Sequence, residues 1–207
     1  MPRPRAFSAL LALGLALTPL GCLDSKRPPG DKTRFDPIAA YSEVAAYAGP
    51  SMRLVEMEAV GVRKDGTIDL TDRSFSPEVE YRFQREVSPP KDAPPVGAGG
   101  GDQWILTVAI TVERPGKTWH EKSTYYDGTR RTRGMMREES GPYARPIEDA
   151  LPAPTCSFAE MWAVGIDRGA PPDAVATIEY DEGRYKWSIQ GTQLELEFDT
   201  DCKLIMG

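Results

Sequence analysis

Histidine and cysteine are scarce in this chain of 207 residues, which contains one histidine, His120, and three cysteines. A metal site that rests on paired imidazoles is therefore excluded, as is the zinc-peptidase helix motif, because both need two histidines. A Ser-His-acid triad would have to use His120, which lies in a polar run, and no nucleophile-elbow motif accompanies it. The sequence thus predicts a surface histidine, no metal site and no cofactor.

Positive charge is also in the minority, with 25 lysines and arginines against 31 aspartates and glutamates and a formal net charge of −6. Because phosphate binding needs a basic field, nucleic acid is not expected as a partner of the whole surface. The hydrophobic fraction of 40% is too high for a wholly disordered chain and suits one or two globular domains.

The apolar stretch near the N-terminus, residues 6–20, is shorter than the run of about 20 residues that a transmembrane helix needs. Arg3 and Arg5 precede this stretch, and Gly21 and Cys22 follow it. Such an order of basic, apolar and small residues is typical of a secretory signal. We expect residues 1–21 to be removed, which takes away two arginines and no acid and changes the formal charge from −6 to −8.

The end of this stretch, Leu20-Gly21-Cys22, resembles the lipobox of bacterial lipoproteins, although Pro19 departs from the small or aliphatic residue that is usual there. The resemblance implies a thioether-linked lipid on Cys22, cleavage before it and acylation of the new amino terminus. Leu23, in place of an aspartate, favours the outer membrane of the cell envelope over the inner one. The alternative is a soluble secreted protein in which Cys22 is incidental.

With Cys22 lipidated, Cys156 and Cys202 remain as an even pair in an oxidising compartment. We expect a disulfide between them, which the chain-entropy model values at about 4 kcal/mol. The alternative is two buried thiols. Residues 22–35 are polar and contain prolines, and they are predicted to form a flexible tether with a reach of about 20 Å.

Two helices are predicted from their boundary signals. Asp36-Pro37 begins the first, with Ile38, Tyr41, Ala45 and Ala48 at helical spacing, and Gly49-Pro50 ends it. Ser157 and Glu160 fit a capping box at the start of the second, which ends at Arg168-Gly169. Its apolar stripe consists of Phe158, Met161, Trp162, Gly165 and Ile166.

Elsewhere apolar and polar residues alternate, which predicts strands with one dry and one wet face in residues 79–87, 104–112, 185–190 and 194–199. Hairpin turns are indicated at Asp65-Gly66, Asp127-Gly128, Glu182-Gly183 and Gln190-Gly191. We therefore predict an α+β fold in which two helices pack on one face of an antiparallel sheet.

The two halves have a similar layout, in which a helix precedes an antiparallel meander. We expect a first half at residues 36–137, a linker at 138–155 and a second half at 156–207. Within the first half, residues 88–103 are rich in proline and glycine and are predicted to form a mobile insertion in a hairpin.

The second half, residues 158–205, resembles the PepSY-like domains of exported bacterial proteins. The likeness lies in the apolar helix, in Gly169-Ala170-Pro171, in the strands near residues 178–180 and 185–189, and in the closing segment 198–205. Cys202 stands where a glycine is usual. The resemblance implies a binding role, in which such domains inhibit or chaperone peptidases or take part in envelope sensing, and it supplies no catalytic residue.

Few residues are left as candidate sites. A basic stretch of Arg130, Arg131, Arg133 and Arg137 follows Tyr125 in an otherwise acidic chain. Its first three arginines, with Tyr125, suit a carboxylate or phosphate ligand. The alternative is a solvated hairpin whose charge Glu138 and Glu139 balance. Carboxylate pairs occur at Glu56 and Glu58 and at Glu195 and Glu197, and Asp199-Thr200-Asp201 is a turn or, less favoured, half of a calcium loop.

These features favour a non-enzymatic, lipid-anchored envelope protein that binds a protein or peptide, with sheet edges that can accept a strand from the partner. Two alternatives stay open. One is a carboxylate-dependent hydrolase or carbohydrate-active enzyme, and the other is a purely structural envelope lipoprotein.

Overall fold

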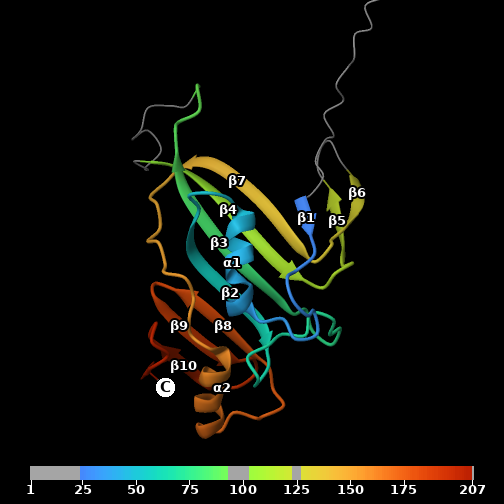
Figure 1. Ribbon diagram of the computed structural model, residues 1–207, viewed down its shortest axis with the longest axis vertical. Coiled ribbons are helices and arrows are strands. Elements are labelled where there is room, and N and C mark those ends of the chain that lie inside the picture. The colour runs from blue at the N-terminus through green and yellow to red at the C-terminus, as the bar shows by residue number, and fades with distance from the viewer. Residues whose placement is uncertain (1–23, 93–102, 123–126, 207) are drawn as a thin grey trace, which may run out of the picture.

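The computed structural model of the chain describes residues 24–92, 103–122 and 127–206. Nine of the strands in these ranges form one antiparallel sheet in the order β1-β7-β4-β3-β2-β8-β9-β10-β11, and β5 pairs with β6 (Figure 1). The elements are β1 (Asp24–Lys26), α1 (Pro37–Ala48), β2 (Arg53–Val62), β3 (Glu78–Val87), β4 (Trp104–Glu113), β5 (Thr118–Lys122), β6 (Asp127–Arg131), β7 (Met135–Ala144), α2 (Phe158–Asp167), β8 (Ala176–Asp181), β9 (Arg184–Ile189), β10 (Glu195–Phe198) and β11 (Leu204–Met206).

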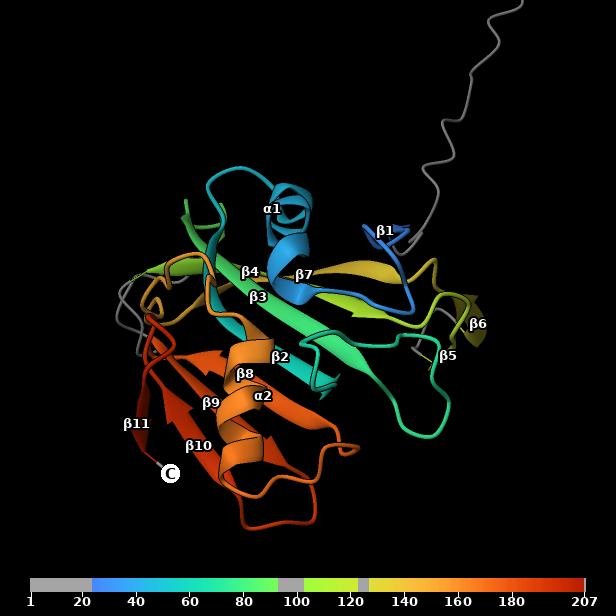
Figure 2. The same cartoon turned by 60° about the horizontal axis from the view of Figure 1, so that its bottom comes forward.

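Each helix is followed by four strands of the large sheet. Strands β2, β3, β4 and β7 follow α1, and β8 to β11 follow α2. The halves meet where β2 pairs antiparallel with β8, with Met57 opposite Tyr180 and Ala59 opposite Ile178. Both helices lie on one face of the sheet, and one continuous core joins them (Figure 2). The predicted α+β architecture is therefore confirmed.

Helix α1 begins as the sequence predicts, because the Asp36 carboxylate accepts hydrogen bonds from the backbone N–H groups of Ile38 and Ala39. Its buried face, however, is rotated from the predicted stripe. The buried residues are Pro37, Ala40, Val44 and Ala48, while Ile38, Tyr41 and Ala45 are only partly buried.

The helix is also tied to the sheet by aromatic side chains. Tyr41 lies 6.4 Å, ring centre to ring centre, from both Tyr81 and Phe83 of β3. The Tyr81 hydroxyl donates a 2.7 Å hydrogen bond to the carbonyl of Pro37. Burial raises the pKa of Tyr81 well above its ordinary value, so this hydroxyl stays protonated and remains a donor.

Helix α2 has the predicted buried stripe of Phe158, Met161, Trp162 and Gly165, but Ile166 is exposed. The predicted capping box is absent, since Ser157 makes no side-chain cap bond. Trp162 packs edge-on against Trp187 of β9 at 5.1 Å, and its indole N–H donates to the carbonyl of Val62. This pair of tryptophans is the centre of the second half.

The predicted tether is wrong from Asp24 onward. Residues 24–26 form β1, which pairs with β7, and Phe35 is buried and exchanges two backbone hydrogen bonds with Ile68. The segment is polar in composition, yet the free edge of β7 and the backbone of Ile68 supply partners that composition does not reveal. It therefore belongs to the folded body.

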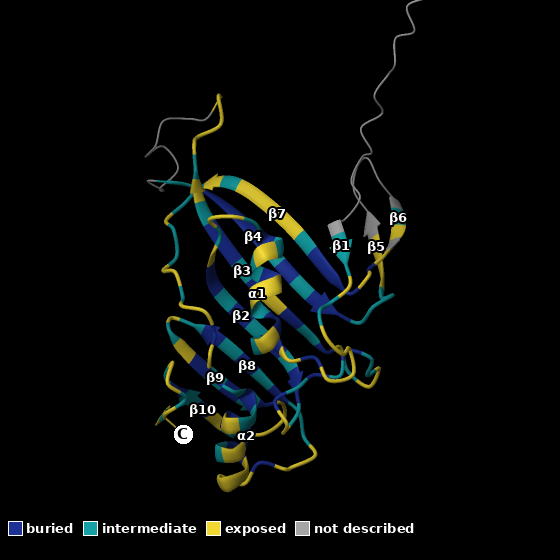
Figure 3. Ribbon diagram, viewed as in Figure 1, coloured by how far each residue is buried: buried dark blue, intermediate teal, exposed yellow. Residues whose placement is uncertain are grey.

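The predicted linker at residues 138–155 also differs, because its first part, residues 138–144, belongs to β7. This strand is buried at Met135 and Met136 and becomes exposed from Glu138 onward (Figure 3). Strands β3 and β4 pair out to Val87 opposite Trp104, so residues 88–103 do interrupt a hairpin. Most of this predicted mobile insertion, residues 93–102, lies outside the described ranges.

Candidate functional site

The arginine-rich stretch meets the segment that follows β1 and forms a concavity of about 740 Å³ with it. We call this concavity the basic pocket. Three arginines and a lysine contribute to it, together with one acid and several small or cyclic residues. The lining residues are Arg27, Pro28, Gly30, Asp31, Lys32, Pro115, Gly116, Arg131, Thr132 and Arg133.

Short-range contacts hold the two walls of the basic pocket together. The backbone N–H of Arg133 donates a 2.7 Å hydrogen bond to the Ser25 hydroxyl in β1. Gly134 has a φ of 112°, and a Cβ at this position would lie within 2.9 Å of the rings of Pro28 and Pro115. Only glycine therefore permits both prolines to close around this point.

The pocket has a net positive charge that the described residues do not compensate. Its single acid, Asp31, accepts hydrogen bonds from the Thr33 N–H and hydroxyl at 2.8 and 2.9 Å, and these bonds lower the pKa of Asp31. Within the described ranges no carboxylate forms an ion pair with Arg27, Lys32, Arg131 or Arg133. Glu139, one of the two acids predicted to balance the basic stretch, pairs with Arg137 of that stretch at 2.7 Å, whereas Arg131 and Arg133 line the pocket.

The structure thus brings Arg131 and Arg133 into one site and adds Arg27 and Lys32, which the sequence had placed in a tether. Tyr125 of the predicted patch lies outside the described residues, as does the side chain of Arg130. No local signal marks Arg27 and Lys32 as partners of the patch, because only the pairing of β1 with β7 brings them there.

The face of the sheet opposite the helices carries an acidic row. Glu58 of β2 stands directly opposite Glu80 of β3 on one side and Glu179 of β8 on the other. Partial burial, and then the charges of Glu179, Glu56 and Glu80, raise the pKa of Glu58. Partial burial and neighbouring glutamates likewise raise the pKa of Glu80. The sequence placed Glu58 on a wet face but could not show the register that aligns it with Glu80 and Glu179.

The predicted carboxylate pairs are separated by their neighbours. Glu56 forms an ion pair with Arg82, which also binds Glu148 at 2.9 Å, whereas Glu58 belongs to the acidic row. Glu56, Arg82 and Glu148 line a second concavity of about 820 Å³ near the turn between β8 and β9. In the other pair, Glu197 lies 3.6 Å from Arg184, and Glu195 is exposed.

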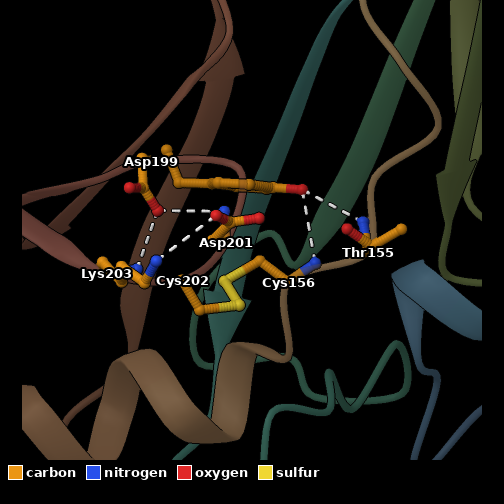
Figure 4. The surroundings of a disulfide bond; sticks show 7 residues. Thr155, Cys156, Asp199, Asp201, Cys202 and Lys203 are labelled. Carbon is orange, nitrogen blue, oxygen red and sulfur yellow. Dashed lines mark hydrogen bonds and ion pairs between the residues drawn. A yellow bond between two sulfur atoms is a disulfide. The ribbon is translucent and has the colours of Figure 1, made fainter.

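Cys156 and Cys202 lie at disulfide distance, with an S–S separation of 2.09 Å and their Cα atoms 5.3 Å apart (Figure 4). The bond ties the start of α2 to the turn between β10 and β11. In this turn the Asp199 carboxylate accepts 2.9 Å hydrogen bonds from the N–H groups of Asp201 and Lys203 (Figure 4). Asp199-Thr200-Asp201 is therefore a hydrogen-bonded turn.

The remaining questions from the sequence concern His120, metal binding and membrane-spanning helices. His120 is exposed in β5, where it stands opposite Thr129. Among the described residues, no group of three or more histidines, cysteines or acids is arranged to hold a metal ion. None of the helices in the described ranges has the length and apolar character to span a membrane.

Comparison with known proteins gives no match to the chain, whether with protein-family models, curated proteins or solved structures.

Proposed function

We propose that the chain is a non-enzymatic protein of the cell envelope, anchored in the outer membrane by a lipid on Cys22, that binds a positively charged segment of a protein or peptide partner. The acidic row carries this proposal. Glu80, Glu58 and Glu179 are aligned on three adjacent strands, and no described helix covers that face of the sheet.

Aligned glutamates have an energetic cost that a partner can remove. Like charges directly opposite each other on neighbouring strands destabilise a sheet by roughly 0.2 to 1 kcal/mol per pair. A lysine- or arginine-rich segment laid across the three strands would replace this repulsion with attraction, so the free energy of binding includes the relief of the repulsion. A neutral or acidic segment would gain nothing comparable.

The edges of the sheet are less suited to a partner strand than the sequence suggested. Each outermost strand, β1 and β11, has three residues. The part of β7 that extends beyond β1 contains Glu138, Glu139 and Pro142, which are residues that discourage strand addition. Docking on the acidic face therefore fits this fold better than strand addition.

The PepSY-like resemblance adds a partner class to the proposal. The second half has an apolar helix followed by an antiparallel meander, which is compatible with that resemblance. The family role it implies is the binding of peptidases or other exported proteins. We therefore expect the partner to be an exported protein with a basic surface segment.

A carboxylate-dependent hydrolase is the second candidate function, and the concavity around Glu56 and Glu148 is the observation that favours it. Arg82 binds both of these carboxylates, which leaves neither of them isolated as a general acid. The binding function is therefore preferred.

Photocrosslinking in intact cells tests the proposed docking face. A photoreactive amino acid is placed at Thr111, directly opposite Glu80, or at Thr177, two residues from Glu179, and the control positions are the exposed Glu43 of α1 and Ala163 of α2. We expect a single protein adduct from the two sheet positions and none from the helix positions. No adduct, or the same adduct from all four positions, would contradict the proposal and favour a purely structural role.

Charge reversal makes the test specific to the acidic row. The triple variant replaces each of its glutamates with lysine, and the control triple variant makes the same change at exposed glutamates of the two helices and of the β8–β9 turn. The two variants are E58K/E80K/E179K and E43K/E160K/E182K. We expect the first variant to lose the adduct and the second to retain it. Equal retention in both variants would exclude the acidic row as the docking site.

A further inference from the structure

We propose that the basic pocket binds the phosphate group of an anionic lipid headgroup in the membrane that holds the anchor. The ligand chemistry is a phosphate-bearing anion, and the pocket is the site formed by Arg27, Lys32, Arg131 and Arg133. This inference goes beyond the proposed partner binding, because it concerns another surface and a ligand of the opposite charge.

The charge of the pocket is the first argument. It gathers four cationic side chains in a concavity of about 740 Å³, in a chain whose acids outnumber its bases. Its one acid, Asp31, offsets one of the four positive charges and accepts two hydrogen bonds from Thr33, so the pocket keeps a net positive charge. An isolated cluster of this kind attracts an anion, since no carboxylate of the described residues pairs with its cationic groups.

The types of side chain point to phosphate. Three of the four cations are arginines, whose planar guanidinium groups donate paired hydrogen bonds to phosphate oxygens. Gly116 contributes to this arrangement, because the Arg131 guanidinium lies 3.0 Å from where a Cβ of residue 116 would be. A side chain at this position would displace the guanidinium, so the glycine leaves room for Arg131 at the pocket wall.

The position of the pocket favours a lipid as the source of the phosphate. Arg27 follows Cys22 by five residues, a distance that a fully extended chain spans in about 17 Å. Strand β1 lies within this interval and is paired with β7, so the pocket has a fixed place close to the anchor. The segment after β1 and the end of β6 line the same pocket, which contains Arg27 and Arg131.

Membrane electrostatics gives the pocket a physical role. The acidic body of the protein is repelled by an anionic membrane surface, whereas each basic residue near that surface contributes about 1 kcal/mol of attraction. A headgroup in the basic pocket would hold this end of the molecule at the membrane and leave the acidic row accessible. The choice of a lipid source rests on the proposed anchor, but phosphate binding itself does not.

Calorimetric titration tests the proposal with three probes. The mature lipidated protein in nonionic detergent is titrated with glycerophosphoglycerol, which is an anionic lipid without its acyl chains, with glycerophosphocholine and with inorganic phosphate. We expect glycerophosphoglycerol to bind at least tenfold more tightly than glycerophosphocholine, and more tightly than inorganic phosphate. Tighter binding of inorganic phosphate would overturn the lipid source, and no binding of either anion would overturn the pocket as a phosphate site.

Matched variants locate the binding. Both variants replace three arginines with glutamine, one in the pocket and one at exposed arginines elsewhere; they are R27Q/R131Q/R133Q and R53Q/R73Q/R168Q. We expect at least a tenfold loss of affinity in the first and none in the second. The single change Arg133→Gln, with circular dichroism and thermal melting as folding checks, should lose affinity in part. Unchanged affinity in a folded pocket variant would overturn the proposal. This result does not depend on the outcome of the crosslinking test, which concerns the acidic row.

Discussion

Cys202 combines two roles at one residue, since it forms the disulfide and has a left-handed backbone conformation with a φ of 64°. Glycine adopts this conformation without strain, whereas residues with a Cβ rarely adopt it. The tyrosine hydroxyl of Tyr185 supports the other end of the bond, because it accepts hydrogen bonds from the N–H groups of Thr155 and Cys156.

Replacement of both cysteines should therefore change the free energy of unfolding in two ways. One is the loss of the cross-link, and the other depends on how well the new residue at position 202 tolerates a positive φ. The bond spans 46 residues, so its loss should lower the free energy of unfolding by about 4 kcal/mol. The double variant C156A/C202G keeps a residue suited to the positive φ and should be about 1 kcal/mol more stable than C156A/C202A. Urea denaturation of the two variants measures the difference, and equal stability would show that the turn does not retain this conformation.

Glu58 allows a second prediction at the scale of a residue. Its pKa in the folded protein is raised above the ordinary value of 4.5, so its carboxylate reduces stability at neutral pH. Glu58→Gln should raise the free energy of unfolding at pH 7 by about 0.5 kcal/mol, the scale of one opposed like-charge pair. The control Glu43→Gln, on the exposed side of α1, should leave stability unchanged, and a destabilised Glu58→Gln variant would contradict the acidic row.

Helix α2 shows how far the pattern of a single element could be predicted. The 3.6-residue period identified Phe158, Met161, Trp162 and Gly165 as the buried stripe, because burial of one face follows from the period itself. The prediction of a capping box was wrong, because Ser157 is at the N-cap position but its side chain forms no cap hydrogen bond. In α1 three of the four predicted positions are shifted by one residue and Ala48 is common to both stripes, because several alanines leave the two candidate faces similar in hydrophobicity.

The contact between Gly165 and Trp187 gives a prediction for this element. A Cβ at residue 165 would lie 2.7 Å from the Trp187 ring, which is itself held against Trp162. Gly165→Ala should destabilise the protein by about 1 to 3 kcal/mol through overpacking, although alanine favours a helix. Thermal melting checks this, and Ala163→Gly, at an exposed position of the same helix, provides the control for helix propensity.

Strand β1 could not be predicted because it has three polar residues and gains its stability from β7, more than a hundred positions away in the sequence. The same separation in sequence explains why only part of the basic pocket could be predicted. Its arginine stretch is contiguous in the chain and visible in the sequence, whereas Arg27 and Lys32 become part of it only through the pairing of β1.

In the described residues, one nine-stranded antiparallel sheet forms a common core with both helices, and β5 and β6 form a separate two-stranded sheet. The stability of the protein should respond to pH in two opposite ways. Glu58 and Glu80 have raised pKa values, so the stability they provide is present below their ordinary pKa of 4.5 and is lost as the pH rises. Hydrogen bonds from Thr33 and Ser74 lower the pKa values of Asp31 and Asp72, so their contribution is present above the ordinary value of 3.8 and is lost at lower pH.

The melting temperature should accordingly reach a maximum between about pH 4 and 5. It should decline toward neutral pH as the acidic row ionises, and it should decline below pH 4 as the aspartates become protonated. In the variant E58Q/E80Q, the melting temperature should fall much less between about pH 5 and neutral pH than in the wild-type protein. Its fall below pH 4 should remain. A melting temperature that rises steadily from pH 4 to 7 in the wild-type protein would contradict these assignments.

The state of the three cysteines in the native protein is the most direct test of its proposed place in the envelope. Mass spectrometric peptide mapping without reduction, on protein isolated from its own membranes, reports all three at once. We predict an N-terminal peptide that begins at Cys22 and carries lipid, and a linked pair of peptides that contain Cys156 and Cys202. An unmodified Cys22 thiol in a chain that still carries residues 1–21 would contradict the lipid anchor, and with it the orientation proposed for the basic pocket.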